Sequence, residues 1–257
     1  MAIHIEEVPN VPFIREGDDI GSIIVEAVTN SEMDLQDKDI LCVASKVVST
    51  AEGQAVSLEG IEAGEVALSI HEQLARKDPR VIQLIIDATG EPTGARLDLD
   101  TNFIAGWLPN GLRLTSAGID KIDAEHVYLP PENSDISARK IARTILEQLG
   151  IRVGIVITDS DGRVEKAGST QIAIGIYGVP GLRITEAIDP ATGETKRSEE
   201  TFSDLIAGSA ALIMGQRGVN KPIVRINGLE YDFDENSSIV DSLSKVPEGY
   251  EKPDLSI

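Results

Sequence analysis

Short apolar segments alternate with amphipathic segments along the whole chain, and this alternation constrains the fold more than any other feature. Val153 to Ile157 is an apolar run typical of a buried strand, whereas Ser137 to Leu149 repeats its apolar residues at the helical period. No internal repeat, low-complexity segment or long linker interrupts the pattern. Strands and helices follow no strict order, so the residues alone leave α+β and mixed α/β architectures open.

The same reasoning places the individual elements. We expect strands or β-hairpins at Asp39–Ser49, Ala95–Leu114, Val153–Ile157, Gln171–Ile176 and Pro222–Ile226. We expect helices from Ile20 with Asp18 as N-cap, and at Glu62–Arg76, Pro79–Asp87, Ser137–Leu149 and Glu199–Met214. Asp78 and Pro79 are a typical helix start, and Gly150 is a typical helix stop. The stretch from Ile176 to Gly193 is rich in Gly and Pro.

Charge and composition exclude several classes of protein. The chain has 43 acidic and 23 basic residues, a formal charge of −20, so it lacks the basic footprint that nucleic-acid binding requires. A solvated acidic surface explains most of these carboxylates, and a minority are available to hold cations. No run of about 18 apolar residues could span a membrane, and the N-terminus does not resemble a signal peptide. We therefore expect a cytoplasmic protein with neither nucleic-acid nor membrane partners.

The sequence lacks the common signatures of zinc, disulfide and phosphate-loop sites. The single cysteine, Cys42, lies in an apolar run, where a buried reduced thiol is expected rather than a nucleophile. The three histidines are scattered without metal-ligand spacing. Neither a G-x-x-x-x-G-K-[ST] loop nor a G-x-G-x-x-G motif is present, so any phosphate site must be built differently.

Polar residues at the ends of predicted elements are the remaining candidates for chemistry. Asp159, Ser160 and Asp161 follow an apolar strand, and Asp120 follows Ala117-Gly118. Read alone, Asp159-Ser160-Asp161-Gly162 is a turn, although a strand end could also present its side chains for function, and Asp120 has the same ambiguity. The basic, glycine-spaced loop after the last predicted helix, Met214 to Lys221, is compatible with phosphate binding or with a simple helix stop.

Taken in order, these segments resemble the coenzyme F-420 γ-glutamyl ligase family. The resemblance covers roughly positions 8 to 229 and rests on an ordered set of motifs. These are Val11-Pro12-Phe13-Ile14, Ala44-Ser45-Lys46-Val47-Val48-Ser49, Ala51-Glu52-Gly53, Ala117-Gly118-Ile119-Asp120, Arg152 to Asp159 with Gly162-Arg163, Ala173-Ile174-Gly175 and Met214-Gly215-Gln216.

The resemblance implies an α+β fold with mixed and antiparallel sheets, packed helices and two intimately associated subdomains within one module, residues 1–257. It implies a homodimer that adds L-glutamate to the deazaflavin F-420-0 with GTP as co-substrate. Two divalent ions, Mg²⁺ or Mn²⁺, are implied, with K⁺ as an optional further ion. Asp120 and Asp159 would hold one divalent ion, and Ser160 and Gln216 the other. The implied nucleotide residues are Val11, Pro12, Phe13, Ile14, Ser45, Lys46, Asp123, Met214, Gly215, Gln216, Arg217, Gly218, Val219, Asn220 and Lys221.

The chain departs from the family pattern at four places. Ser160 replaces a usual threonine, which keeps the hydroxyl group. Asp123 stands where an asparagine is usual, and Thr50 where a lysine is usual, so the charge near a bound phosphate becomes more negative. The segment Asp189 to Glu194 differs most. Two alternatives therefore stay open: an amide ligase with a different acceptor acid, and a non-catalytic protein that binds a nucleotide or deazaflavin.

The predicted hairpin Ala95–Leu114 bears on assembly. It carries Phe103, Ile104, Leu108 and the only tryptophan, Trp107, which is more apolar surface than a small hairpin buries alone. This surface could pack on helices of its own domain. Together with the resemblance, it leads us to expect the dimer contact near this hairpin.

Overall fold

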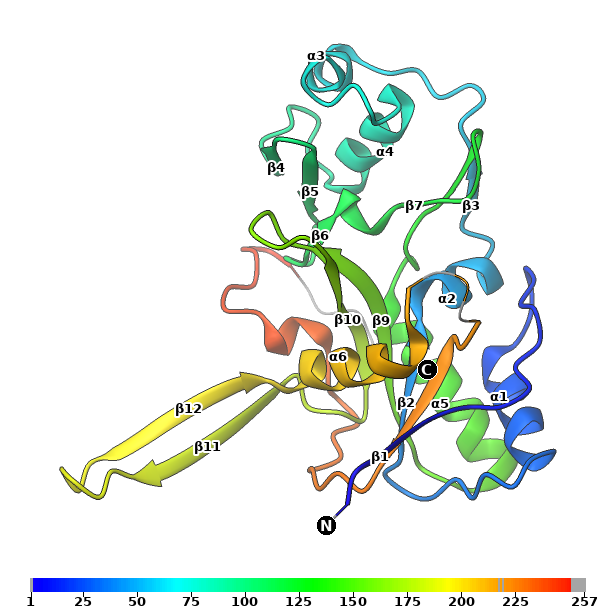
Figure 1. Ribbon diagram of the computed structural model, residues 1–257, viewed down its shortest axis with the longest axis vertical. Coiled ribbons are helices and arrows are strands. Elements are labelled where there is room, and N and C mark those ends of the chain that lie inside the picture. The colour runs from blue at the N-terminus through cyan, green and yellow to red at the C-terminus, as the bar shows by residue number, and fades with distance from the viewer. Residues whose placement is uncertain (1, 217, 219, 251–257) are drawn as a thin grey trace.

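The chain folds around a five-stranded sheet, seen in a computed structural model that describes residues 2–216, 218 and 220–250 (Figure 1). The strand order is β1-β13-β2-β9-β10, in which only β2 and β9 run parallel. The strands are β1 (His4–Glu7), β13 (Ile223–Asn227), β2 (Ile40–Ala44), β9 (Gly154–Gly162) and β10 (Ser169–Tyr177). Their apolar side chains form the larger of two hydrophobic cores.

Helices cover both faces of this sheet. Because side chains alternate along a strand, Ile157 and Thr158 of β9 face opposite sides. Gly175, the cross-strand partner of Ile157, lies against Ser134 of α5 (Ser134–Leu149), which also packs on α1 (Ile20–Thr29). On the other side, the hydroxyl of Thr158 lies 3.6 Å from the sulfur of Met214, the last residue of α6 (Phe202–Met214). The sheet is thus covered by α1 and α5 on one face and by α6 on the other.

A second core lies above the sheet in Figure 1. It contains α3 (Glu65–Gln73), α4 (Pro79–Ala88) and two small antiparallel sheets of three strands each. One sheet has the order β3-β8-β7 and the other β4-β5-β6. Their strands are β3 (Ala55–Ser57), β8 (His126–Tyr128), β7 (Asp120–Lys121), β4 (Leu97–Asp100), β5 (Phe103–Trp107) and β6 (Arg113–Thr115). A short helix, α2 (Ser45–Ala51), links β2 to β3.

A two-stranded arm projects from the body of the molecule (Figure 1). Within the part of the chain that the structure describes, strands β11 (Leu182–Ile188) and β12 (Thr195–Thr201) pair only with each other, and almost all of their residues are exposed. Ile184 and Ile188 are 50% and 72% exposed. The sequence did not predict these strands, because their apolar residues are few and a Gly- and Pro-rich stretch precedes them.

The α+β fold class is confirmed, and several elements match the sequence closely. In α4 the Asp78 carboxylate accepts a hydrogen bond from the Arg80 N–H, with Pro79 at the first helical position. Gly150 ends α5 in the left-handed conformation, φ 72°. Cys42 is fully buried, as expected, and burial raises the pKa of its thiol.

Four local predictions were wrong. The strand predicted for Asp39–Ser49 ends at Ala44, and the chain continues as the helix α2. Of the two valines after Ala44, only Val48 is fully buried, which suits one face of a helix. Asp19, not Asp18, caps α1 by accepting from the Ser22 N–H. The helix expected from Glu199 begins only at Phe202, because the preceding residues pair in the arm.

The fourth error concerns Asp159-Ser160-Asp161-Gly162. Read alone, this segment is a turn, but in the structure it is the second half of β9 and pairs with β10. An acidic strand end is unusual by propensity, and it forms here because its carboxylates receive hydrogen bonds from neighbouring elements.

The hairpin Ala95–Leu114 packs on its own helices. Ile104, Ala105 and Leu114 are almost fully buried, while Trp107 is 42% exposed and donates its indole N–H to Asp98 at 3.2 Å. Most of the apolar surface that suggested an intermolecular contact is therefore covered within the chain.

Candidate active site

The polar end of β9 places side chains on both faces of the central sheet. Asp159 and Asp161 face the α5 side, and Ser160, between them, faces the α6 side. A strand fixes these directions more firmly than a turn would, because its backbone is hydrogen-bonded to β10. The predicted metal ligands at positions 159 and 160 are thus presented by a rigid element.

Asp159 is a buried carboxylate beside a second carboxylate. Its Oδ1 accepts a hydrogen bond of 2.8 Å from the hydroxyl of Ser45, the first residue of α2. Burial, followed by the negative charge of Asp120, raises the pKa of Asp159 to about 7. Nearby positive charge would relieve this cost, which makes the pair a candidate cation site.

Asp120 already has one cationic partner. Its Oδ2 lies 3.1 Å from the Nζ of Lys46, and both side chains are about half exposed. The chain reaches Asp120 through Ser116, Ala117 and Gly118, all in the left-handed region. Ala117 is fully buried at φ 53°, an uncommon backbone for an alanine that the packing around it must hold in place.

Ser160 and Gln216 are also brought together. The Ser160 hydroxyl donates to the Gln216 Oε1 at 3.0 Å. The contact forms because α6 ends at Met214, and Gly215, with φ 64° and ψ −162°, turns the chain back towards β9. Four residues predicted as metal ligands therefore form two pairs around one strand end, Asp159 with Asp120 and Ser160 with Gln216.

A residue that the sequence did not single out as a ligand supports this arrangement. Asp161 is buried, and its Oδ1 accepts 2.8 Å hydrogen bonds from both the N–H and the hydroxyl of Thr115. The contact joins β9 to β6, five residues before Asp120. Its position two residues after Asp159, on the same strand face, is the signal that sequence reasoning could have used.

The predicted nucleotide residues lie in part near the same sheet edge. The N–H of Val8 donates to Ile223, and that of Ala44 donates to Pro222, so the segment 11–14 starts beside the strand end that leads into Ser45. Phe13 is 86% exposed, but Ile14 and Met214 are buried. Pro12, Gly218 and Asn220 are exposed, while Val11 and Gly215 are half-buried. Lys221 pairs with Glu7 at 2.8 Å. Arg217 and Val219 lie outside the described residues.

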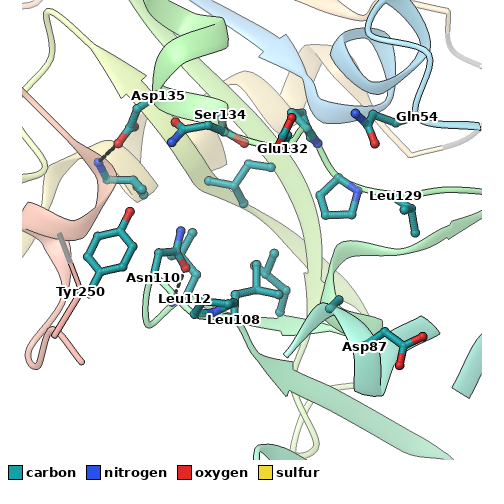
Figure 2. Close-up of a pocket in the computed structure, with 18 of the residues that line it drawn as sticks. Gln54, Asp87, Leu108, Asn110, Leu112, Leu129, Glu132, Ser134, Asp135 and Tyr250 are labelled. Atoms are coloured by element: carbon teal, nitrogen blue, oxygen red, sulfur yellow. Dashed lines mark hydrogen bonds between the residues drawn. The ribbon is translucent and has the colours of Figure 1, made fainter. Parts of the chain in front are cut away.

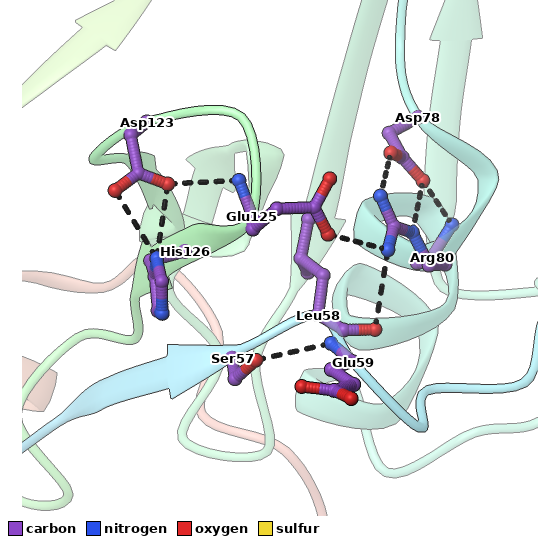
Figure 3. A network of polar contacts seen from close by, with 8 residues as sticks. All are labelled: Ser57, Leu58, Glu59, Asp78, Arg80, Asp123, Glu125 and His126. Atoms are coloured by element: carbon purple, nitrogen blue, oxygen red, sulfur yellow. Dashed lines mark hydrogen bonds and ion pairs between the residues drawn. The ribbon is translucent and has the colours of Figure 1, made fainter.

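Asp123 is held by its own turn (Figure 3). Its carboxylate accepts from the Glu125 N–H at 2.8 Å and contacts the His126 ring nitrogen at 3.0 Å, and these interactions lower its pKa. Glu125 in turn pairs with Arg80 at 3.0 Å, which is held by Asp78. The network ties the β7–β8 turn to α4. Asp123 thus brings a fixed negative charge to the place where the resemblance implied a nucleotide contact.

The donor set fits a divalent ion whose remaining coordination positions are filled by a substrate. Within the described part of the chain, no group of three or more His, Cys, Asp or Glu side chains could hold a metal. Asp120 and Asp159 supply two carboxylates, and Ser160 and Gln216 add a hydroxyl and an amide oxygen. Mg²⁺ characteristically takes one or two protein carboxylates and fills its other positions with phosphate oxygens and water. The site is therefore suited to an ion that arrives with a phosphorylated substrate.

A well-defined cavity lies elsewhere in the molecule (Figure 2). It measures about 650 Å³, and its lining comes from Gln54, α4, residues within 108–114, the segment 129–135, Ile174, Ile239 and Tyr250. None of the residues predicted from sequence as ligands lines it. We therefore take the convergence of charged side chains, not cavity size, as the marker of the site.

Within residues 2–216, 218 and 220–250, no helix has the length and apolar character needed to cross a membrane.

The buried Asp159 carboxylate leads to a stability prediction. In the metal-free protein its folded pKa of about 7 exceeds the unfolded value near 4, so stability should fall as pH rises between these values and then level off. Asp159→Asn has no carboxylate to ionise at this position. At pH 8 its free energy of unfolding should exceed that of the wild type by on the order of 1 kcal/mol or more. Urea unfolding with a chelator at pH 4, 6 and 8 measures the difference. Equal pH profiles would contradict a costly buried charge.

Known proteins resemble this chain over most of its length. Residues 9–228 match the family model described as "F420-0:Gamma-glutamyl ligase". A Methanosarcina mazei protein named "Coenzyme F420:L-glutamate ligase" is 37% identical over 238 residues, covering 91% of this chain and 89% of that protein. Proteins of the same name from Methanopyrus kandleri and Archaeoglobus fulgidus are each 34% identical, covering 90% and 89% of this chain and 89% of each relative. The chain belongs to the F-420-0:γ-glutamyl ligase family and is an enzyme that forms carbon–nitrogen bonds.

Proposed function

We propose that the chain is a GTP-dependent ligase that joins L-glutamate to the deazaflavin F-420-0 through an amide bond. The observation that carries this proposal is the convergence of Asp120, Asp159, Lys46 and the Ser160–Gln216 pair at one strand end. Family membership supports the reaction class, the family description names F-420-0, and the names of the relatives include L-glutamate. Since GTP and glutamate are cytoplasmic metabolites, we expect the enzyme to work in the cytoplasm.

The proposed reaction has two steps. A carboxylate oxygen of F-420-0 attacks the γ-phosphorus of GTP, which forms an acyl phosphate and releases GDP. The amine of glutamate then attacks the acyl carbon, the C–O bond to phosphate breaks, and the amide, inorganic phosphate and a proton are released. Phosphoryl transfer of this kind depends mainly on positioning and on stabilising negative charge.

The residues of the site have separable roles in this scheme. Asp120 and Asp159 would hold one divalent ion, and Ser160 and Gln216 a second. Mg²⁺ or Mn²⁺ bound there would neutralise charge on the phosphates, with K⁺ as an optional further ion. Ser45 holds the Asp159 carboxylate in place. Lys46 is half exposed and pairs with Asp120. When the nucleotide binds, the ammonium group leaves Asp120 and orients a phosphate oxygen instead.

A direct assay tests the proposal. Purified protein is incubated with F-420-0, glutamate, GTP and Mn²⁺, and products are separated by mass. We expect glutamylated F-420-0 with one GDP and one phosphate per amide bond formed. Folded, Mn²⁺-loaded protein that yields no such product would contradict the assignment. Turnover of another acid at a higher rate would favour the ligase with a different acceptor.

The structure bears on the sequence departures that motivated the two alternatives. The divergent segment Asp189 to Glu194 is the tip of the β11–β12 arm, where the Asp189 N–H donates to Glu194. It projects away from the body of its own chain (Figure 1). Thr50 donates its hydroxyl to the Lys46 carbonyl within α2. Phosphate release that depends on an acceptor would exclude the non-catalytic alternative.

We also propose that the enzyme is a homodimer whose contact includes the arm. An isolated two-stranded hairpin is at best marginally stable in water, and Ile184 and Ile188 expose apolar surface on it. A second chain would cover this surface. Trp107, where the sequence placed the contact, is a second candidate with its 42% exposure.

Charged substitutions in the arm are expected to weaken the dimer. Ile184→Glu combined with Ile188→Glu should raise the dimer dissociation constant at least tenfold, about 1.4 kcal/mol, because two charges would be buried without partners. Light scattering over a concentration series measures the change, with Trp107→Ala as a comparison. A wild-type mass near the 27.5 kDa of one chain at micromolar concentration would refute the dimer. An unaffected dimer in the arm variant would refute only the role of the arm.

A further inference from the structure

Gln171 is a buried amide whose oxygen lacks a partner. The residue is only 6% exposed, and its Oε1 accepts no hydrogen bond within the described part of the chain. An unsatisfied buried polar atom costs folding free energy, so a glutamine here requires a compensating role.

The position of Gln171 points to that role. It lies on β10 directly opposite Ser160 on β9, and cross-strand partners project to the same face of a sheet. On that face Ser160 donates to the Gln216 Oε1 at 3.0 Å, and the end of α6 covers the strands. The Gln171 side chain therefore leaves the sheet beside Ser160, on the face that carries the Ser160–Gln216 contact.

We propose that the Gln171 Oε1 is a further oxygen ligand of the cation held by Ser160 and Gln216. This inference rests on the proposed function, which assigns an ion to that pair. Amide carbonyl and hydroxyl oxygens are hard donors of the kind that Mg²⁺ and Mn²⁺ accept. Coordination would use the lone pairs that the metal-free protein leaves unpaired on Gln171.

The charge of this donor set has a consequence. Ser160, Gln216 and Gln171 are all neutral, whereas the Asp120–Asp159 pair on the other side of the strand carries the carboxylates. A divalent ion held only by neutral oxygens needs negative charge from its other ligands. The phosphates of the nucleotide supply this charge, so occupancy of the neutral site should depend on nucleotide far more than occupancy of the carboxylate site.

Mn²⁺ binding to the intact enzyme tests the inference without requiring turnover. Electron paramagnetic resonance counts bound Mn²⁺ with and without a non-hydrolysable GTP analogue, in wild type and in Gln171→Met, which keeps the volume and removes the donor. We expect the analogue-dependent Mn²⁺ to bind at least tenfold more weakly in Gln171→Met, with the other ion unchanged. Gln171→Glu, which keeps an oxygen ligand, should bind that ion at least as tightly as wild type. Gln73→Met, an exposed glutamine, is the matched control.

The possible outcomes separate this inference from the proposed function. Wild type and Gln171→Met binding two Mn²⁺ ions with equal affinity would overturn the role of Gln171 and leave the ligase proposal intact. Gln171→Met would then differ only in the stability of the metal-free protein, as expected for a packing residue. Wild type that binds no analogue-dependent Mn²⁺ would overturn both the inference and the two-ion part of the proposed function.

Discussion

Asp159→Asn is expected to lower the rate of glutamate ligation about 10³-fold while the protein stays folded. The substitution keeps the shape of the side chain and an oxygen that accepts from Ser45, but it removes the carboxylate assigned to a divalent ion. Loss of charge stabilisation on the transferring phosphoryl group is worth several kcal/mol, and each 1.4 kcal/mol is a factor of ten in rate. Asp120→Asn should have a similar effect, because it removes the second carboxylate of the pair.

In this experiment stability should rise while Mn²⁺ affinity and turnover fall. Asp159→Asn should be more stable than wild type without metal, since a costly buried charge is gone, yet it should bind Mn²⁺ more weakly and turn over more slowly. Unfolding therefore cannot explain the lost activity. Asp232→Asn, an exposed carboxylate outside the site, is the control and should retain wild-type values for all three measurements. Unchanged Mn²⁺ affinity in Asp159→Asn would show that this carboxylate has only a structural role.

Sequence reasoning succeeded where local patterns agree with the tertiary structure. Asp78 and Pro79 start α4, and Gly150 ends α5, because caps are read within a few neighbouring residues. It failed where contacts between distant residues decide. The segment Asp159–Asp161 has the composition of a turn, but hydrogen bonds from Ser45 and Thr115 stabilise it as a strand. The arm was missed because its strands have no apolar face towards their own core.

The candidate site shows the same limits. The motif order identified Asp120, Asp159, Ser160 and Gln216, and the structure brings them together in two pairs. Their separate roles could not be derived from spacing, since Ser160 and Asp159 face opposite sides of the sheet. Gln171 carried no signal in the sequence. Gln171 became a candidate ligand through the strand register and its unpaired oxygen, and only the three-dimensional structure reveals these two features.

A buried ion pair at the opposite end of β2 gives the second large prediction. Arg225 donates to the Asp39 Oδ2 at 2.6 Å, to Glu6 at 3.0 Å and to the Asp34 carbonyl at 2.7 Å. Asp39 also accepts from the Asn227 amide at 2.5 Å and from the Gln36 N–H at 2.9 Å. Asp39 and Arg225 are 1% and 8% exposed. This cluster joins β1, β13 and the start of β2.

Asp39→Ala is expected to destabilise the protein by about 3–5 kcal/mol, because the buried Arg225 guanidinium then lacks the carboxylate of Asp39 as its partner. Asp39→Leu combined with Arg225→Met should cost less than the single change, since no charge is then stranded. Glu147→Ala, which breaks the exposed pair with Arg143, should cost under about 1 kcal/mol. Urea midpoints at constant m-value measure all three. The five residues of β2 separate Asp39 from Ser45 by about 20 Å, so the folded fraction of Asp39→Ala should keep its turnover number. A single variant as stable as the double one would show that the pair contributes little beyond its volume.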